Sequence, residues 1–217
     1  MYTAILFDMD VVLLDSEPLF LKAINDNLSE YGVDIISDEE NQSFLIGTTI
    51  HQTWERIKSV RELDKTVEDL ITDYEKHVLG IFGGPLDARP GVQALVEYCN
   101  KMAIPIAVAS SSQHRWIDIK LKAIGLTGFF DSIMGGDDVK NGKPDPEVYL
   151  ESARRLGKDA TECIAIEDSP VGISSAIASG AFTIAVKTES TEGLDVSAAN
   201  VLIEDLTHFD YGLLSKP

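Results

Sequence analysis

Residues 163–186 read CIAIEDSPVGISSAIASGAFTIAV and contain a complete strand–helix–strand pattern. The two apolar runs, CIAI and FTIAV, have the length and content of strands that are buried on both faces. The stretch between them predicts a helix over 170–179, because Pro170 stands in its first turn and Gly180 follows its last turn. A helix that joins two buried strands is typical of a parallel sheet, so this segment predicts an α/β fold.

The same alternation extends in both directions along the chain. Short apolar runs predict further strands, and the helical patterns between them have Gly or Pro near their ends. The additional strands are expected at 2–7, 104–109, 132–134 and 201–203, and the additional helices at 91–102, 113–124 and 145–156.

The stretch from 16 to 86 interrupts this alternation. Its apolar residues recur with helical spacing, as in Ile50, Trp54 and Ile57, and no convincing strand occurs within it. We therefore expect 16–86 to form an all-helical cap domain. It is inserted into a Rossmann-like α/β core that is built from 1–15 and 87–217.

Composition limits the classes of partner. The 217 residues carry a net charge of −18, from 18 basic and 36 acidic side chains. Such a surface repels phosphate backbones, so we expect no nucleic-acid or membrane partner. The apolar runs are too short to span a bilayer and no signal peptide is evident. Cys99 and Cys163 lie in apolar contexts typical of reduced thiols, which indicates a cytoplasmic protein, and a monomer is the default expectation.

Polar residues follow the predicted strands where each strand ends. Because ligands of open parallel sheets bind beyond the carboxyl ends of the strands, these residues are expected to form one site. The loop around 142–146, GKPDP, adds a lysine. The residues concerned are Asp8 and Asp10, Ser110 and Ser111, Glu167 and Asp168, and Lys143.

This set of side chains suits phosphoryl transfer assisted by Mg²⁺. The ion prefers hard oxygen ligands, which Asp8, Asp168 and the backbone carbonyl of Asp10 can supply. Carboxylates concentrated without a cation would repel one another, so the site implies a metal. One carboxylate attacks phosphorus, and the second, two residues on, protonates the leaving group and then deprotonates water. Ser110 and Lys143 would hold the transferring phosphoryl oxygens.

With these motifs in order, the sequence resembles the haloacid dehalogenase superfamily. It is closest to the branch of beta-phosphoglucomutase and small sugar-phosphate phosphatases, which carry a helical cap after the first motif. The resemblance implies that Asp8 is the nucleophile and Asp10 the general acid and base. It also implies that Asp8, Asp10 and Asp168 bind Mg²⁺. Glu167 either assists the metal or caps the following helix.

Two residues of the first motif bear on the activity. The true dehalogenases lack a second Asp two residues after the nucleophile, because a halide needs no proton, so Asp10 favours phosphate chemistry. Most family members have Gly next, whereas this chain has Val11. A β-branched residue at positive φ costs roughly 1–2 kcal/mol, so a weakened catalyst or an inactive phosphate-binding protein is a further alternative.

The cap bears on the choice between phosphatase and mutase. In mutase-like relatives a cap Gly is followed closely by an Arg that grips the second phosphate, but here the segment reads Gly47-Thr48-Thr49-Ile50-His51. Gly47, Thr48 and Lys76 are the cap residues expected to contact substrate. Without the Arg, we predict a phosphatase for a small phosphomonoester such as a sugar phosphate. A sugar phosphomutase is the alternative.

Overall fold

The computed structural model describes residues 1–45, 49–188 and 193–214. The chain divides into two compact units, each considered by itself below. The core unit comprises Met1–Asp15 and Pro85–Pro217, and the cap unit comprises Ser16–Gly84.

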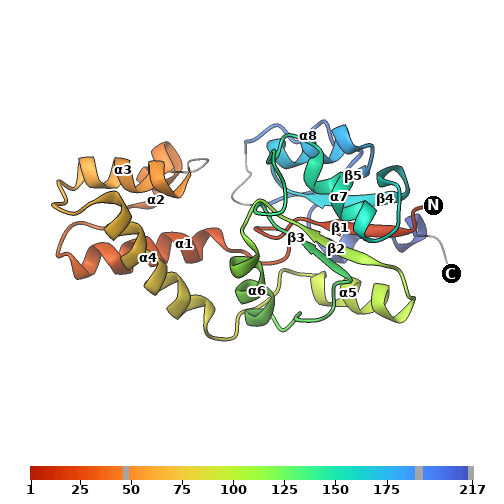
Figure 1. The fold of residues 1–217 in the computed structure, drawn as a ribbon, viewed down its shortest axis with the longest axis horizontal. Helices are drawn as coiled ribbons and strands as arrows, with labels where there is room; N and C mark the ends of the chain where they lie inside the picture. The colour runs from red at the N-terminus through yellow and green to blue at the C-terminus, as the bar shows by residue number, and fades with distance from the viewer. Residues whose placement is uncertain (46–48, 189–192, 215–217) are drawn as a thin grey trace. The chain divides into compact units, whose positions relative to one another are not determined.

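The core unit is built on a parallel sheet of order β3-β2-β1-β4-β5-β6 (Figure 1). The central strand β1 pairs with β2 on one side and β4 on the other, so that Phe7 lies opposite both Val108 and Ile166. This confirms the expected α/β class and its parallel sheet. The strands are β1 Ala4–Phe7, β2 Ile106–Ala109, β3 Ser132–Met134, β4 Cys163–Glu167, β5 Phe182–Val186 and β6 Val201–Ile203.

Helices cover both faces of the sheet, α5 and α6 on one and α7 and α8 on the other (Figure 1). The three strands β1, β2 and β4 are buried along their whole length, as their continuous apolar sequences require. The helices are α5 Val92–Lys101, α6 His114–Ala123, α7 Glu147–Arg155 and α8 Pro170–Ser179. Short 3-10 turns lie at η2 Ala160–Glu162, η4 Leu206–His208 and η5 Tyr211–Leu213.

Local signals fix the ends of these helices. The Ser169 hydroxyl caps α8 by accepting a hydrogen bond from the Gly172 N–H at 3.1 Å. Gly180 ends the same helix with φ +88°, a conformation that a residue with a Cβ rarely adopts. The strand order reverses between β1 and β4: β2 and β3 follow on one side of β1, and β4, β5 and β6 on the other. Open α/β sheets bind ligands beyond the carboxyl ends of the strands at such a reversal.

Among the described residues of the cap unit, every regular element is a helix. Its longest helices, α1 and α4, pack against each other, and Trp54 of α3 is fully buried against Tyr74 of α4. The Thr49 and Thr66 hydroxyls cap α3 and α4. The elements are α1 Glu17–Glu30, α2 Asp38–Glu40, a π-helical turn η1 Asn41–Leu45, α3 Ile50–Val60 and α4 Val67–Phe82.

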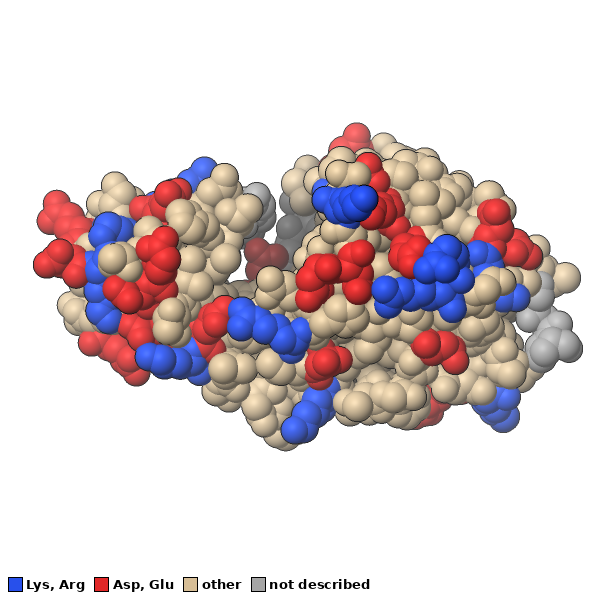
Figure 2. Space-filling view, viewed as in Figure 1, with Lys and Arg blue, Asp and Glu red and all other residues tan. Residues whose placement is uncertain are grey.

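The surface has the acidic character expected from the composition. Figure 2 shows Asp and Glu side chains over both units, with Lys and Arg side chains standing among them. Cys99 and Cys163 are buried free thiols. Among the described helices, none combines the length and the apolar content that crossing a membrane requires.

The loop after β1 contains the departure noted in the sequence. Val11 has φ +64°, so the chain does adopt the left-handed conformation at the position where the family resemblance implies Gly. The Val11 N–H donates to the Leu14 carbonyl at 2.8 Å, which closes a tight turn directly after Asp10. The valine side chain is nevertheless buried, 7% exposed, so its packing offsets part of the backbone strain.

Replacing Val11 should therefore cost less than replacing its neighbour. Val12 is 1% exposed and its backbone is not in the left-handed region. Both Val11→Gly and Val12→Gly lose a buried side chain, but only the first relieves backbone strain. Urea titration should show Val11→Gly to be the less destabilising by about 1–2 kcal/mol. Equal losses at the two positions would mean that Val11 is not strained.

Candidate active site

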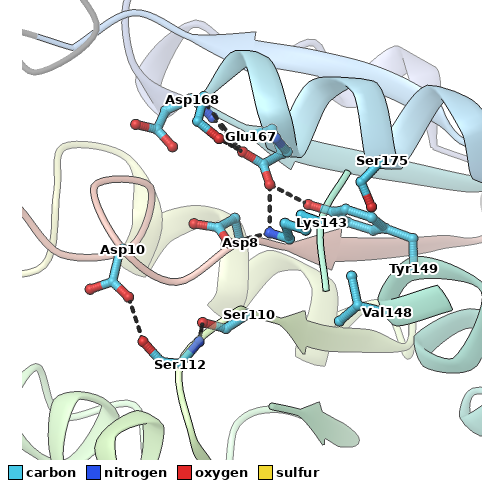
Figure 3. A network of polar contacts seen from close by, with 12 residues as sticks. Asp8, Asp10, Ser110, Ser112, Lys143, Val148, Tyr149, Glu167, Asp168 and Ser175 are labelled. Atoms are coloured by element: carbon cyan, nitrogen blue, oxygen red, sulfur yellow. Dashed lines mark hydrogen bonds and ion pairs between the residues drawn. The ribbon is translucent and has the colours of Figure 1, made fainter. Parts of the chain in front are cut away.

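The first pair of site residues stands at the carboxyl ends of the two central strands. Asp8 follows β1 and its N–H donates to the Ile166 carbonyl of β4 at 2.9 Å. Asp168 follows β4. Both residues are buried, with 7% of Asp8 and 6% of Asp168 exposed. Parallel pairing therefore delivers two carboxylates, 160 positions apart in the numbering, to one edge of the sheet (Figure 3).

Lys143 brings a positive charge into this group of carboxylates. Its Nζ lies 2.5 Å from Asp8 Oδ1 and 2.6 Å from Glu167 Oε1, and its side chain is only 6% exposed. Burial alone would lower the pKa of Lys143, but the Asp8 and Glu167 carboxylates raise it well above the ordinary value. Lys143 is therefore stabilised as a cation beside the predicted nucleophile.

Glu167 holds Lys143 in this position. Its side chain is fully buried, and Oε1 accepts hydrogen bonds from both Lys143 and the Tyr149 hydroxyl, the latter at 2.7 Å. Oε2 accepts from the Asp168 and Ser169 N–H groups at 3.0 and 3.3 Å. The Tyr149 ring also lies beneath the Lys143 ammonium, 5.0 Å from it. Both oxygens of Glu167 are thus engaged by groups of the protein (Figure 3).

Asp8, Glu167 and Asp168 together fit a metal ion. One oxygen from each lies within 4.8 Å of the others. Burial, opposed by Lys143 and reinforced by Glu167, raises the pKa of Asp8 to about 7. Burial, reinforced by Asp8 and Glu167, raises the pKa of Asp168 to about 9. Carboxyls that are so reluctant to ionise are stabilised as anions by a divalent cation, and hard carboxylate oxygens are the donors that Mg²⁺ prefers.

Asp10 points to a different set of donors. Its Oδ1 accepts from Lys120 Nζ at 2.5 Å, and its Oδ2 accepts from the Ser112 hydroxyl at 2.9 Å. The Asp10 side chain is 31% exposed, more than the side chains of Asp8 at 11% and Glu167 at 0%. Figure 3 places it apart from the Lys143 network, on the loop that follows β1.

The residues after β2 occupy the adjoining part of the edge. Ser110 is 1% exposed, and its hydroxyl oxygen accepts from the Ser112 N–H at 3.0 Å. Its own N–H donates to the Met134 carbonyl at 3.0 Å, which anchors the start of the loop to β3. Ser111 is exposed at the turn of this loop. The structure thus brings Asp8, Asp10, Ser110, Lys143, Glu167 and Asp168 to one edge of the core unit.

The predicted cap residues have a different standing. Gly47 and Thr48 lie outside the described residues. Lys76 lies on α4 of the cap unit, where its ammonium is 2.6 Å from Asp73 and its side chain is 69% exposed. Their contact with substrate stays a prediction.

Two neighbours of the predicted site residues were not anticipated from the sequence. Lys120 is 2% exposed and contacts Asp10, and Tyr149 is fully buried and contacts Glu167. Lys120 carried a signal, because it stands on the apolar stripe of its helix between Ile117 and Leu121, where a charged residue is out of place. Tyr149 carried none, because a tyrosine in a buried helix face is ordinary.

Comparison with known proteins adds an independent line of evidence. A family model described as haloacid dehalogenase-like hydrolase matches residues 5–186. The matched range contains both carboxylate pairs and Lys143, together with the whole cap unit.

Individual relatives agree with this match. The Phosphorylated carbohydrates phosphatase of Thermotoga maritima is 30% identical over 82% of this chain and 81% of its own length. Protein SUPPRESSOR OF QUENCHING 1, chloroplastic, of Arabidopsis thaliana is 34% identical over 94% of this chain, which spans only 19% of that protein. The crystal structure of CbbY from Rhodobacter sphaeroides in complex with phosphate is 25% identical, with a TM-score of 0.82 over 96% of each chain.

The contact between Glu167 and α8 can be tested with two glycines. A Cβ at Gly172 would lie 1.9 Å from Glu167 Oε1, whereas a Cβ at Gly80 of α4 would meet nothing within 4 Å. We expect Gly172→Ala to lower the free energy of unfolding by a few kcal/mol, as overpacking does, and Gly80→Ala to raise it by about 0.5–1 kcal/mol. Thermal melts of both variants check this. A Gly172→Ala variant as stable as the parent would contradict the packing described.

The raised pKa values predict a pH-dependent response to Mg²⁺. In the unfolded chain Asp8 and Asp168 have their ordinary, lower pKa values. The unfolded chain therefore binds fewer protons than the folded, metal-free protein. The stabilisation from these protons is lost as the pH rises from about 4 through 7 and 9. The metal-free melting temperature should therefore fall between about pH 6 and pH 8. Because Mg²⁺ competes with protons for these carboxylates, it should raise the melting temperature more at about pH 8 than at about pH 6.

Asp168→Asn is the control for this measurement. It removes the group with the higher pKa, so both the pH dependence and the effect of Mg²⁺ should diminish. An Mg²⁺ effect that is equal at the two pH values, or unchanged in the variant, would argue against a metal held by these carboxylates.

Proposed function

Given that the chain belongs to the haloacid dehalogenase-like hydrolase family, we propose that it is a Mg²⁺-dependent phosphatase of a small phosphomonoester. The observation that carries the proposal is the buried Asp8 carboxylate, which contacts Lys143 and stands beside Asp168, with Asp10 two residues further on. A phosphorylated sugar is the substrate class favoured, since the relative from Thermotoga maritima is named as a phosphatase of phosphorylated carbohydrates.

The proposed metal ligands are the carboxylates of Asp8 and Asp168, with Asp10 contributing its backbone carbonyl. When bound there, Mg²⁺ would neutralise negative charge on the phosphoryl group. Glu167 belongs to the same cluster, but its two oxygens already accept hydrogen bonds from Lys143, Tyr149 and the backbone. We therefore assign to Glu167 the orientation of Lys143 and of the Asp168 loop.

In the first half of the reaction an Asp8 oxygen attacks phosphorus. A bond forms between that oxygen and phosphorus, while the bond from phosphorus to the leaving oxygen breaks. Asp10 enters this step as the neutral acid, having taken a proton from solvent. It donates that proton to the leaving oxygen and becomes a carboxylate, and the alcohol departs. Lys143, which contacts Asp8, and Ser110 would hold the phosphoryl oxygens.

In the second half water replaces the aspartyl oxygen. Asp10, now a carboxylate, takes a proton from water as the water oxygen bonds to phosphorus. The bond between phosphorus and Asp8 breaks, inorganic phosphate leaves, and both aspartates return to their starting states. Asp10 is suited to both steps because it is partly exposed and close to Asp8, yet outside the Lys143 network.

The acidic surface is compatible with an anionic substrate. The net charge of −18 gives no general attraction for phosphate, so attraction has to arise within the site. Lys143 and a bound divalent cation supply positive charge there, and a small ligand feels these close charges more than distant, screened surface carboxylates.

The test is phosphate release from a panel of phosphorylated metabolites with Mg²⁺. We expect release from one or a few sugar phosphates, abolished by EDTA and reduced by at least about 1,000-fold in Asp8→Asn, which lacks the nucleophile. Isomerisation of a hexose 1-phosphate with little phosphate release would instead identify a mutase. Binding of Mg²⁺ and phosphate without turnover of any ester would identify an inactive binding protein.

A further inference from the structure

Lys120 is a buried cation in a helix face that otherwise packs into the apolar core. It lies on α6 with Ile117 and Leu121 as neighbours on the same stripe, and its side chain is only 2% exposed. A lysine placed there loses both hydration and side-chain freedom, which is unfavourable unless close partners compensate. Lys120 has such partners, and one of them is a carboxylate of the site.

That carboxylate belongs to Asp10. Lys120 Nζ donates to Asp10 Oδ1 at 2.5 Å and to the Ser112 hydroxyl oxygen at 3.2 Å. The single hydroxyl proton of Ser112 is donated to Asp10 Oδ2 at 2.9 Å. The three groups form a closed triangle in which each donor has a distinct acceptor and both Asp10 oxygens are held.

The triangle ties a strained loop to a rigid helix. Asp10 precedes Val11, the residue with φ +64°, and its side chain is otherwise carried by the turn after β1. Lys120 reaches it from the sixth helix, whose backbone is fixed by packing on the sheet. A carboxylate bound at both oxygens has lost its rotational freedom before any substrate arrives, which is the preorganisation that proton transfer requires.

We infer that Lys120 is a positioning residue that, together with Ser112, fixes the Asp10 carboxyl group for proton transfer to the leaving oxygen. The inference rests on the proposed function and adds to it a residue outside the set predicted from the sequence. In this assignment Lys120 acts through Asp10.

The test compares two esters that differ in their need for a proton. The leaving group of an alkyl phosphate, such as a sugar phosphate, is an unstable alkoxide unless its oxygen is protonated. The leaving group of p-nitrophenyl phosphate is p-nitrophenolate, a stable anion that needs no proton. Because kcat/KM reports only the steps up to departure of the leaving group, it isolates the first half of the reaction. Lys120→Met should lower kcat/KM about 10- to 100-fold for the alkyl ester and less than about threefold for p-nitrophenyl phosphate.

Three further variants make the comparison specific. Lys122→Met removes the same charge from an exposed site on the same helix and should leave both values unchanged. Ser112→Ala removes the second donor to Asp10 and leaves the buried charge of Lys120 in place. It should also lower kcat/KM more for the alkyl ester than for p-nitrophenyl phosphate, by a smaller factor than Lys120→Met. In an Asp10→Asn background, Lys120→Met should have no further effect on the alkyl ester, because the group that it positions is already gone.

The outcomes separate the two proposals. Equal losses for both esters in Lys120→Met and Ser112→Ala, or full additivity with Asp10→Asn, would overturn the positioning role while the phosphatase stands. If Lys120→Met does not fold by circular dichroism, Ser112→Ala and its combination with Asp10→Asn decide the question alone. Wild-type protein that hydrolyses neither ester would overturn the proposed function and this inference with it.

Discussion

The buried ammonium of Lys143 is the group around which the rest of the site is arranged. It lies between the carboxylates of Asp8 and Glu167, at 2.5 and 2.6 Å, with almost no contact with water. Burying these charges is expensive, and the expense is offset only when every partner is in place. This explains why Glu167 is saturated with hydrogen bonds and why Tyr149 contributes both its hydroxyl and its ring face.

The fold supplies these partners from segments that are distant in sequence. Asp8 comes from β1, Glu167 from β4 and Lys143 from the loop before α7, and the pairing of β1 with β4 fixes the first two relative to each other. The first turn of α8 then passes so close to Glu167 that only a glycine fits at position 172. The geometry of a charged site is thus set by backbone packing, which is stiffer than any surface contact.

Negative charge in the site is only partly neutralised by nearby lysines, in a protein whose overall charge is strongly negative. Four carboxylates, those of Asp8, Asp10, Glu167 and Asp168, face the two buried ammonium groups of Lys143 and Lys120. The remaining excess of negative charge is what a divalent cation would neutralise, and it is concentrated at Asp8 and Asp168, whose pKa values burial raises to about 7 and about 9. The arrangement therefore separates the carboxylates proposed to bind the metal from the Asp10 side chain, which has its own partners.

The sequence by itself determined the α/β class and the six strands to within about two residues. It also predicted a helical insert and a set of site residues that follow the strands. It could do so because buried strands, helix ends and turns depend on local composition and periodicity. It also indicated the strain at Val11, which depends on one residue's backbone conformation. Only the tertiary structure decided that Glu167 accepts hydrogen bonds from Lys143 and Tyr149. The same holds for the contact between Lys120 and Asp10, which lie 110 positions apart in the sequence. Such contacts depend on how helices pack onto the sheet, and no local pattern encodes which buried side chains then meet.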